Sequence, residues 1–320
     1  MTSRPAQALL PNEPRQINWT KEKKLSDRFL LSEMASIEAF LYHLRSAVDE
    51  QLQSLQPFKA GKPYPLGQCL EITLAMQRRL KQINNLPLKG APAVGRAALN
   101  RFLTRGGTMR QIWGDLRGEY FQNAFLIGTL YVDVSNDTVI ASKPKIEILP
   151  FENACLSPIM DFEHFARLAR KYWKAEVLPN CVLPRLAPYA PLICVFPDGS
   201  VQLHDTSKYM VNLTLRDAFI PSQTFLTRAP IDMVIFQQLV ACLKGTANAI
   251  PNSPDEGRQL AVAQCQKYAE KLVQTSTEQI NEFMKNITAV NQHLTQFKVS
   301  KYTNLTPNTH ATYVTVSKSP

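Results

Sequence analysis

Residues 64–80, YPLGQCLEITLAMQRRL, form the segment from which the rest of the chain is best understood. The turn formers Pro65 and Gly67 lead directly into an amphipathic helix, and Cys69 falls in the first turn of that helix. Unpaired N–H groups and the positive end of the helix dipole meet there, where they lower the pKa of a thiol and increase its nucleophilicity. The segment therefore predicts a helix that presents a cysteine suited to thiol chemistry.

A second segment, residues 119–139 with the sequence EYFQNAFLIGTLYVDVSNDTV, has the pattern of two strands joined at Gly128. The second strand ends on the carboxylate Asp133. Together with residues 110–116 this segment predicts a three-stranded antiparallel sheet, and residues 144–150 predict an edge strand beside it. We expect the cysteine-bearing helix to pack against this sheet.

Composition sets the broad class of the protein. The 320 residues are 45% apolar, which is enough to bury a sizeable core in one large domain or two ordinary ones. Strand-forming and helical segments both occur, so the expected fold class is α+β. The longest apolar runs are far too short to cross a membrane, and the N-terminus lacks a signal-peptide pattern. We therefore expect a cytoplasmic protein, and injection into a host cell would also need no cleaved signal.

The distribution of apolar and turn-forming residues divides the chain into five predicted segments. They are a flexible N-terminal arm (1–28), an α+β domain that contains Cys69 (29–178), a mixed α/β region (179–250), a long helical element (251–298) and a flexible tail (299–320). Proline-dense residues 179–191 predict a boundary or a long loop, and residues 192–203 predict a hairpin. A break near residues 275–277 would turn the long helical element into a helical hairpin.

The formal net charge of +10 is spread over basic stretches at residues 21–24, 78–81 and 96–110. Such a surface attracts nucleic acid, anionic lipid or an acidic protein, and a merely solvated basic surface is the alternative interpretation. The chain has no zinc-finger spacing, aromatic RNA-binding signature or basic zipper, so its charge pattern supports nucleic acid binding only weakly.

The six cysteines form no CxxC pair and show no metal-ligand spacing, which indicates reduced thiols and predicts no metal site. Cys194 and Cys265 lie in apolar segments, so we expect both in the core. The chain contains no phosphate-binding glycine loop and no HExxH, GxSxG or kinase motif, so no cofactor is predicted.

The order of a helix-opening cysteine, a strand pair and an aspartate resembles the core of the transglutaminase-like branch of the papain-fold enzymes. Residues 67–69, GQC, resemble the nucleophile segment of that family, and residues 130–133, LYVD, resemble the end of its strand pair. The resemblance covers residues 64–139, less than a quarter of the chain. It implies a cysteine enzyme in which Cys69 is the nucleophile and Asp133 is the orienting carboxylate.

The histidine of that family has no counterpart in this hairpin, because the corresponding position holds Phe121, Gln122 or Asn123, depending on the alignment. An amide cannot accept a proton at neutral pH, so the hairpin alone cannot form a thiolate–imidazolium pair. Either a histidine from elsewhere completes the site, or the chemistry differs, or the fold is kept for binding after loss of catalysis. His204, which ends a predicted strand beside Asp205, is the outside candidate.

Each of the four candidate site residues has a catalytic and a structural interpretation. Cys69 is a nucleophile or a small buried hydrophobe in a helix. Asp133 is the orienting carboxylate or a strand end closed by Asx hydrogen bonds. Gln122 is an oxyanion-stabilising or orienting group, which would act with backbone N–H groups near Cys69. His204 is a general base or one member of a surface hydrogen-bonding pair.

The leading hypothesis is a cysteine-dependent hydrolase or acyltransferase of transglutaminase-like type that acts on a protein or peptide amide. The alternative is a non-catalytic interaction protein that binds a protein or a nucleic acid through its basic surface and its long C-terminal helix. In that case replacement of Cys69 is silent, whereas charge reversal at Arg78 and Arg79 or disruption of the helical seam abolishes binding. The same helix offers a route to oligomers.

Overall fold

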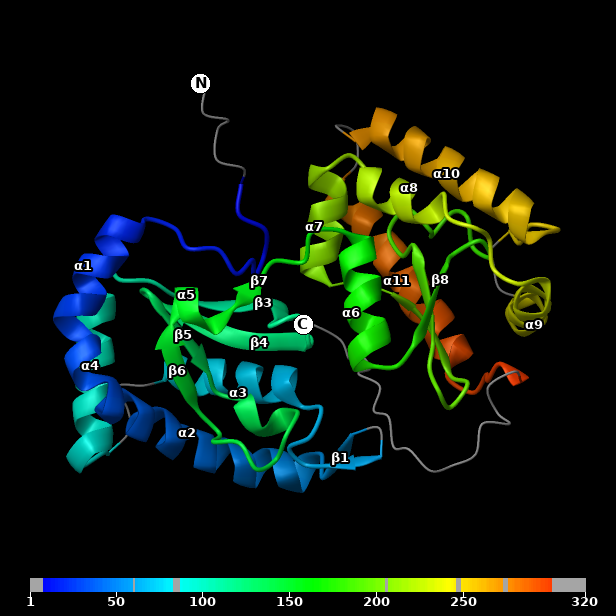
Figure 1. Cartoon of the computed structure of the whole chain (residues 1–320). Helices are drawn as coiled ribbons and strands as arrows, with labels where there is room; N and C mark the ends of the chain where they lie inside the picture. Colours follow the sequence, from blue (N-terminus) through cyan, green and yellow to red (C-terminus); the bar gives the residue numbers. More distant parts are fainter. Residues whose placement is uncertain are drawn as a thin grey trace. The chain divides into compact units, whose positions relative to one another are not determined.

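The computed structural model describes residues 8–59, 61–82, 87–204, 207–245, 249–272 and 276–300. The described residues form two compact units, the first ending at Pro158 and the second beginning at Ile159 (Figure 1). Each unit combines helices with an antiparallel sheet, so the predicted α+β class is confirmed. No helix in the described part of the chain is long and apolar enough to span a membrane.

In the first unit most of the helices precede the five-stranded antiparallel sheet along the chain. Its helices are α1 (Trp19–Phe29), α2 (Met34–Leu55), α3 (Cys69–Lys81), α4 (Gly90–Thr104) and the short α5 (Phe151–Ala154), with 3-10 turns at Leu31–Glu33 and Asn136–Thr138. The sheet contains β3 (Met109–Leu116), β4 (Tyr120–Ile127), β5 (Leu130–Asp133), β6 (Glu147–Pro150) and β7 (Leu156–Ser157), while β1 (Phe58–Lys59) and β2 (Lys62–Pro63) form a separate hairpin. The strand order is β6-β5-β4-β3-β7, which confirms the three predicted strands and the predicted edge strand.

The register of the sheet determines which side chains meet the helices. Phe125 on β4 pairs with Val132 on β5, and both belong to the core cluster that also contains the buried faces of α2, α3 and α4. Leu126 pairs with Tyr131 on the opposite face, where the core cluster includes Ala154 of α5. The cysteine-bearing helix α3 therefore packs against one face of the sheet, as predicted.

Helix α4 lies very close to α2 because Gly95 has no side chain. A Cβ at Gly95 would lie 2.0 Å from the carbonyl oxygen of Ser36. The close approach allows Phe102 of α4 and Phe40 of α2 to fill the same core cluster, and both are fully buried. The two helices therefore form one continuous layer over the sheet.

Helix α1 lies within the residues that were predicted to form a flexible arm. Two buried polar side chains anchor it to distant backbone groups. Glu22 accepts a hydrogen bond from the Thr108 N–H at 3.2 Å, and Ser26 accepts one from the Thr129 N–H at 3.0 Å. A helix that is anchored by polar contacts has a weak apolar period, which explains why the sequence pattern did not indicate it.

The second unit surrounds a three-stranded antiparallel sheet with helices. In chain order it contains α6 (Phe162–Tyr172), β8 (Glu176–Pro179), β9 (Leu192–Val195), β10 (Val201–His204), α7 (Lys208–Arg216), α8 (Ile220–Leu226), α9 (Met233–Leu243), α10 (Pro254–Glu270) and α11 (Thr277–Leu294). Strands β9 and β10 form the predicted hairpin, and the strand order is β10-β9-β8. Cys194 and Cys265 are fully buried, so their predicted place in the core is confirmed.

Residues 179–191, predicted to be a boundary or a long loop, lie inside the second unit. Leu183 and Tyr189 in this segment are buried members of its core cluster. Asn180 Nδ2 donates to the Ala190 carbonyl at 2.9 Å, and Asn180 Oδ1 accepts from the Leu183 N–H at 3.1 Å. Because these bonds satisfy the backbone groups, a segment without regular structure can be buried.

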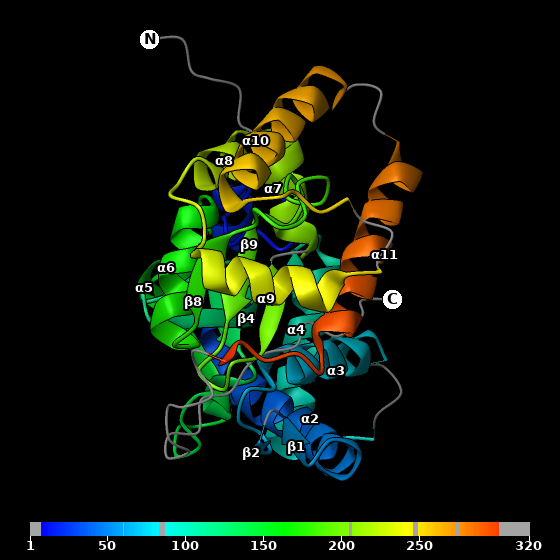
Figure 2. The ribbon, with the colours of Figure 1, turned by 90° about the vertical axis from the view of Figure 1, so that its right-hand side faces the viewer.

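The predicted C-terminal helical element consists of two helices, α10 and α11, which Figure 2 shows as separate elements. Residue 275 of the predicted break (275–277) and residues 301–320 of the predicted tail lie outside the described residues. Helix α11 begins with a capping box between Ser276 and Gln279. The seam residues of α11 are buried in the core of the second unit, namely Ile287, Val290 and Leu294.

Candidate functional site

Cys69 is the first residue of α3 and is partly exposed. Its Sγ accepts a hydrogen bond from Asn123 Nδ2 on β4, with 3.7 Å between the two atoms. Asn123 Oδ1 in turn accepts a hydrogen bond from Gln111 Nε2 on β3 at 3.1 Å. Because that oxygen already faces a donor, Asn123 presents its NH₂ group to the thiol. The group that faces the sulfur is therefore a hydrogen-bond donor and not a base.

Neighbouring residues 122 and 123 point to opposite faces of the sheet, because side chains alternate along a strand. Asn123 shares the helix-covered face with Phe125, which is where Cys69 lies. Gln122 lies on the other face, together with Asp133 at the end of β5. Of the three residues that could replace the missing histidine, the structure thus places Asn123 against the thiol.

The carboxylate of Asp133 is fully buried and accepts four hydrogen bonds. Gln122 Nε2 donates to Oδ2 at 2.6 Å, and the Tyr131 hydroxyl donates to the same oxygen at 3.1 Å. The Ser135 N–H and hydroxyl both donate to Oδ1, at 2.7 Å and 3.0 Å. Burial raises the pKa of Asp133 to about 6, and these four bonds oppose the rise. The structure therefore brings Gln122 and Asp133 together, and Asp133 orients Gln122 rather than Asn123.

The entry of α3 is held by backbone and side-chain hydrogen bonds rather than by a capping side chain. The Gly67 N–H donates to the Thr138 carbonyl at 2.8 Å, and Gly67 has a φ of 73°, a backbone conformation that favours glycine. The buried side chain of Gln68 donates from Nε2 to the Gln56 carbonyl at 3.0 Å. The position of Cys69 therefore depends on the loop that follows β5.

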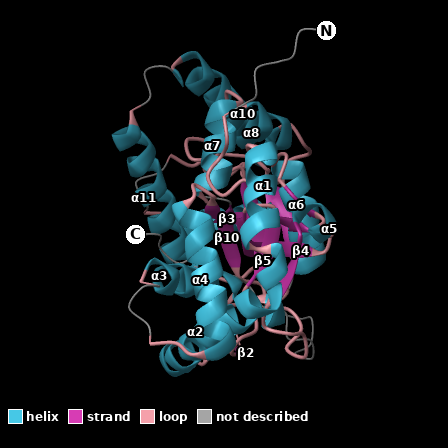
Figure 3. Cartoon of the chain, turned by 90° about the vertical axis from the view of Figure 1, so that its left-hand side faces the viewer, coloured by secondary structure: helices cyan, strands magenta, loops and turns pink. Residues whose placement is uncertain are grey.

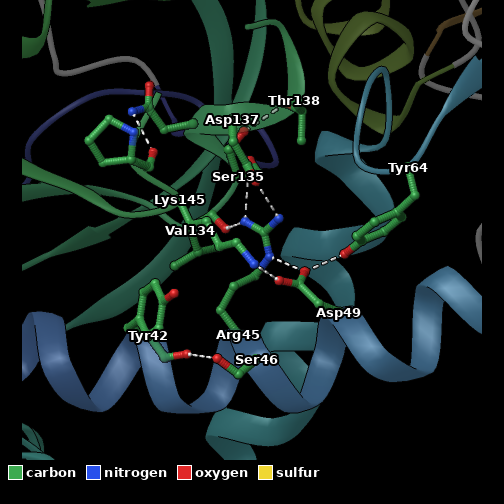
Figure 4. Close-up of polar contacts among 12 residues, drawn as sticks. Tyr42, Arg45, Ser46, Asp49, Tyr64, Val134, Ser135, Asp137, Thr138 and Lys145 are labelled. Carbon is green, nitrogen blue, oxygen red and sulfur yellow. Dashed lines mark hydrogen bonds and ion pairs between the residues drawn. The ribbon is translucent and has the colours of Figure 1, made fainter. Parts of the chain in front are cut away.

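That loop is fixed by Arg45, whose side chain is fully buried on α2 (Figure 4). Its guanidinium donates to both carboxylate oxygens of Asp137, at 3.0 Å and 2.9 Å, and to the Val134 carbonyl at 2.6 Å. A two-point contact between a guanidinium and a carboxylate sets direction as well as distance. These contacts hold residues 134–138 against α2. The hydrogen bond from the Gly67 N–H to the Thr138 carbonyl then fixes the start of α3 relative to the same loop.

The other side of the Arg45 guanidinium meets Asp49, one turn further along α2. Asp49 also accepts hydrogen bonds from the Tyr64 hydroxyl and from Lys145 Nζ, each at 2.5 Å (Figure 4). Burial tends to raise the pKa of Asp49, but these donors together with Arg45 hold it below its usual range. The network therefore contains two cations and two carboxylates that neutralise one another.

The charge around Cys69 does not favour a thiolate. Burial raises the pKa of the Cys69 thiol above its usual range, and the carboxylates of Glu71 and Asp133 add to the rise. The Lys59 ammonium and the Asn123 amide act in the opposite direction. Lys59 is itself almost fully buried and forms an ion pair with Glu71 at 2.7 Å, so much of its field is neutralised.

His204 belongs to the second unit, and its described contacts are all with residues of that unit. Its ring lies 5.2 Å from the Trp173 ring and 6.2 Å from the Phe165 ring, and Nε2 lies 3.1 Å from Gln202 Oε1. Burial lowers the pKa of His204 to about 4. Its predicted neighbour Asp205 lies outside the described residues.

The described part of the first unit contains a single histidine, His43, which is exposed on α2. Within the described residues of the first unit, no imidazole contacts Cys69. In the described part of the chain, no group of three or more His, Cys, Asp or Glu side chains is placed to hold a metal ion.

Several residues that build the site were not identified from the sequence, notably Lys59, Gln111 and Arg45. One signal was available for Arg45, because it interrupts the apolar stripe of α2 between Leu41 and Val48. A charge in such a stripe indicates a buried partner. Lys59 and Gln111 carry no comparable local signal.

No family model matches this chain, and the searches of curated proteins and of solved structures also found no match. The resemblance to transglutaminase-like enzymes therefore rests on residues 64–139 alone and stays a prediction.

Proposed function

We propose that this protein is a non-catalytic interaction protein built on a framework that resembles the transglutaminase-like enzymes. The observation that carries the proposal is the contact between Asn123 Nδ2 and Cys69 Sγ, where the resemblance implies a histidine. An amide cannot take the proton of a thiol, so this pair cannot produce the nucleophile that the reaction requires. The raised pKa of the Cys69 thiol supports the same conclusion.

The excess of basic residues makes an acidic macromolecule the expected partner. The apolar seam of α11 packs inside the second unit, so we assign partner binding to the basic surface rather than to that seam. Asn291 strengthens this packing, because its side chain accepts from the Leu203 N–H at 2.8 Å and donates to the Leu203 carbonyl at 3.1 Å. Formation of oligomers through the C-terminal helices stays a prediction.

The test is the rate at which iodoacetamide alkylates Cys69 from pH 5 to pH 9, with the Cys69→Ser variant used to subtract the other thiols. We expect a titration midpoint above the roughly 8.5 of a free thiol. In the Asn123→His variant an imidazole faces the sulfur, and we expect the midpoint to fall because an imidazolium stabilises a thiolate. Asn123→Gln keeps the amide and serves as the matched control. A wild-type midpoint well below 8.5 contradicts the proposal.

A second candidate is the cysteine-dependent hydrolase or acyltransferase acting on a protein or peptide amide. Three features favour an anion at Cys69 Sγ, namely the helix start, the Asn123 amide and the Lys59 ammonium. In this candidate Cys69 is the nucleophile, and backbone N–H groups near it stabilise the oxyanion. Gln122 and Asp133 lie on the other face of the sheet, so they support the strand that carries Asn123 and do not contact the substrate. His204, which is buried within the second unit, is given no role in this candidate. A titration midpoint of Cys69 well below about 8.5 in the alkylation experiment would favour this candidate over the first proposal.

A further inference from the structure

Five exposed cations form what we call the basic face, namely Lys21, Lys24 and Arg28 on α1, Arg101 in the last turn of α4, and Arg105, which directly follows α4. The cations of α1 recur at spacings of three and four residues, and Arg101 and Arg105 are four residues apart. Side chains at these spacings project from the same side of a helix. Each helix therefore presents one stripe of positive charge.

The two stripes lie on neighbouring helices, because α1 packs on α4 in the first unit (Figure 3). A Cβ at Gly106 would lie 3.2 Å from Lys21 Nζ, so the first cation of α1 lies beside the residue that follows Arg105. In the first half of α4, Gly95 touches Ser36 of α2, and Ser36 follows the C-terminal end of α1 in the chain. The start of α1 therefore lies near the end of α4, and α1 and α4 run in opposite directions.

Both carboxylates of α1 already have partners. Glu22 is buried and accepts a hydrogen bond from the Thr108 N–H, and Asp27 is paired with Lys23 at 2.7 Å. Helix α4 contains no acidic residue. Within the part of the chain that the structure describes, none of the five cations forms an ion pair. The basic face is therefore not neutralised by the protein itself.

We propose that the basic face binds the phosphate backbone of a nucleic acid, an inference that rests on the proposed function as an interaction protein. Exposed side chains beside the cations are small, as at Ala97 and Thr104. A membrane-binding helix needs a continuous apolar face to insert, whereas the exposed large apolar side chains here are single ones, namely Trp19 at the start of α1, Leu31 just after its end and Val94 in the first half of α4. A protein partner needs an apolar centre in its interface, which the basic face also lacks.

The expected affinity is strongly salt-dependent. Each cation that neutralises a phosphate releases a counterion, so five contacts with a duplex give a slope of log K against log salt of about −4.5. Binding should then weaken about 500-fold between 50 mM and 200 mM salt. Backbone contacts carry no sequence information, so we expect little dependence on base sequence.

The experiment is fluorescence anisotropy of the full chain with a labelled random-sequence DNA duplex and with a single-stranded RNA, over 50–200 mM salt. The Arg101→Glu, Arg105→Glu double variant should weaken binding throughout this range and reduce the magnitude of the slope by about 2. The matched control is Arg167→Glu, Lys244→Glu, which makes the same change in net charge at two exposed cations of the second unit, outside every basic stretch named above. We expect the control to keep the wild-type slope.

Equal losses in the two double variants would overturn the assignment to the basic face. Binding to neither nucleic acid at 50 mM salt would overturn the proposal, as would binding only to phosphatidylserine vesicles or only to poly-glutamate. Circular dichroism of each variant checks that the fold is intact. These outcomes leave the non-catalytic proposal standing, because that proposal is tested separately by the titration of Cys69.

Discussion

A fully buried guanidinium such as that of Arg45 requires that all of its charge be matched nearby. Arg45 meets this requirement through Asp137, Asp49 and the Val134 carbonyl. At the scale of single residues, the arrangement explains how the start of α3 is held although no side chain caps it. The same logic applies to Asn123, whose orientation at the thiol is set by one hydrogen bond from Gln111.

Replacement of Arg45 by Met should lower the free energy of unfolding of the first unit by about 3–5 kcal/mol, because Asp137 is left buried and unpaired. Trp113 fluorescence during urea denaturation measures the change. The matched control is Lys23→Met, which removes an exposed ion pair with Asp27 and should cost less than about 1 kcal/mol. A loss at Arg45 as small as the loss at Lys23 would contradict the buried-network interpretation.

Helices α2 and α4 show at the scale of elements how one glycine sets the spacing of a layer. Their contact at Gly95 and Ser36 brings the core-facing sides of both helices onto the sheet. The sheet then receives α3 on the same face, which places Cys69 against β4. The site therefore depends on the spacing of neighbouring helices as well as on its own residues.

Gly95→Ala should destabilise the first unit by about 1–3 kcal/mol, because the added Cβ meets a backbone atom that cannot move aside. Helix propensity alone predicts the opposite, a gain of about 1 kcal/mol. Ala97→Gly, on the exposed side of α4, measures the propensity term without the contact. Thermal or urea unfolding of both variants separates the two effects, and a stabilised Gly95→Ala variant would show that the helices are not in close contact.

The two compact units of the whole molecule contain buried titratable groups with opposite effects on stability. In the first unit, the folded state raises the pKa of Asp133 to about 6, so its contribution to stability is lost as pH rises through 6. In the second unit, the folded state lowers the pKa of His204 to about 4, so its contribution is lost as pH falls from about 6.5 to 4. Mild acid should therefore strengthen one unit and weaken the other.

From pH 7 to pH 5 we expect Asp133 to add about 1 kcal/mol to the first unit and His204 to remove about 2 kcal/mol from the second. Trp173 is the tryptophan of the second unit, so its fluorescence in a Trp19→Phe, Trp113→Phe background follows that unit alone. His204→Gln should flatten the pH dependence of the second unit and leave the first unchanged. An unchanged profile would show that His204 is not buried in its neutral form.

Local sequence signals were sufficient for the elements around the site and for the fold class. The turn before Cys69, the strands β3, β4 and β5, the edge strand β6 and the β9–β10 hairpin were all indicated by turn formers and apolar periods. Such signals depend on residues only a few positions apart, so they can be detected in a single sequence.

Contacts between distant segments fix everything else about the site. Cys69 and Asn123 are 54 residues apart, and the packing of α3 on one face of β4 determines that Asn123 rather than Gln122 faces the sulfur. Arg45 and Asp137 are 92 residues apart, and α1 is held by contacts that span 86 residues or more. The pKa of a thiol depends on burial and on the charges that surround it in space. The sequence therefore indicates where a reactive cysteine could lie, whereas packing determines that its neighbour is an amide.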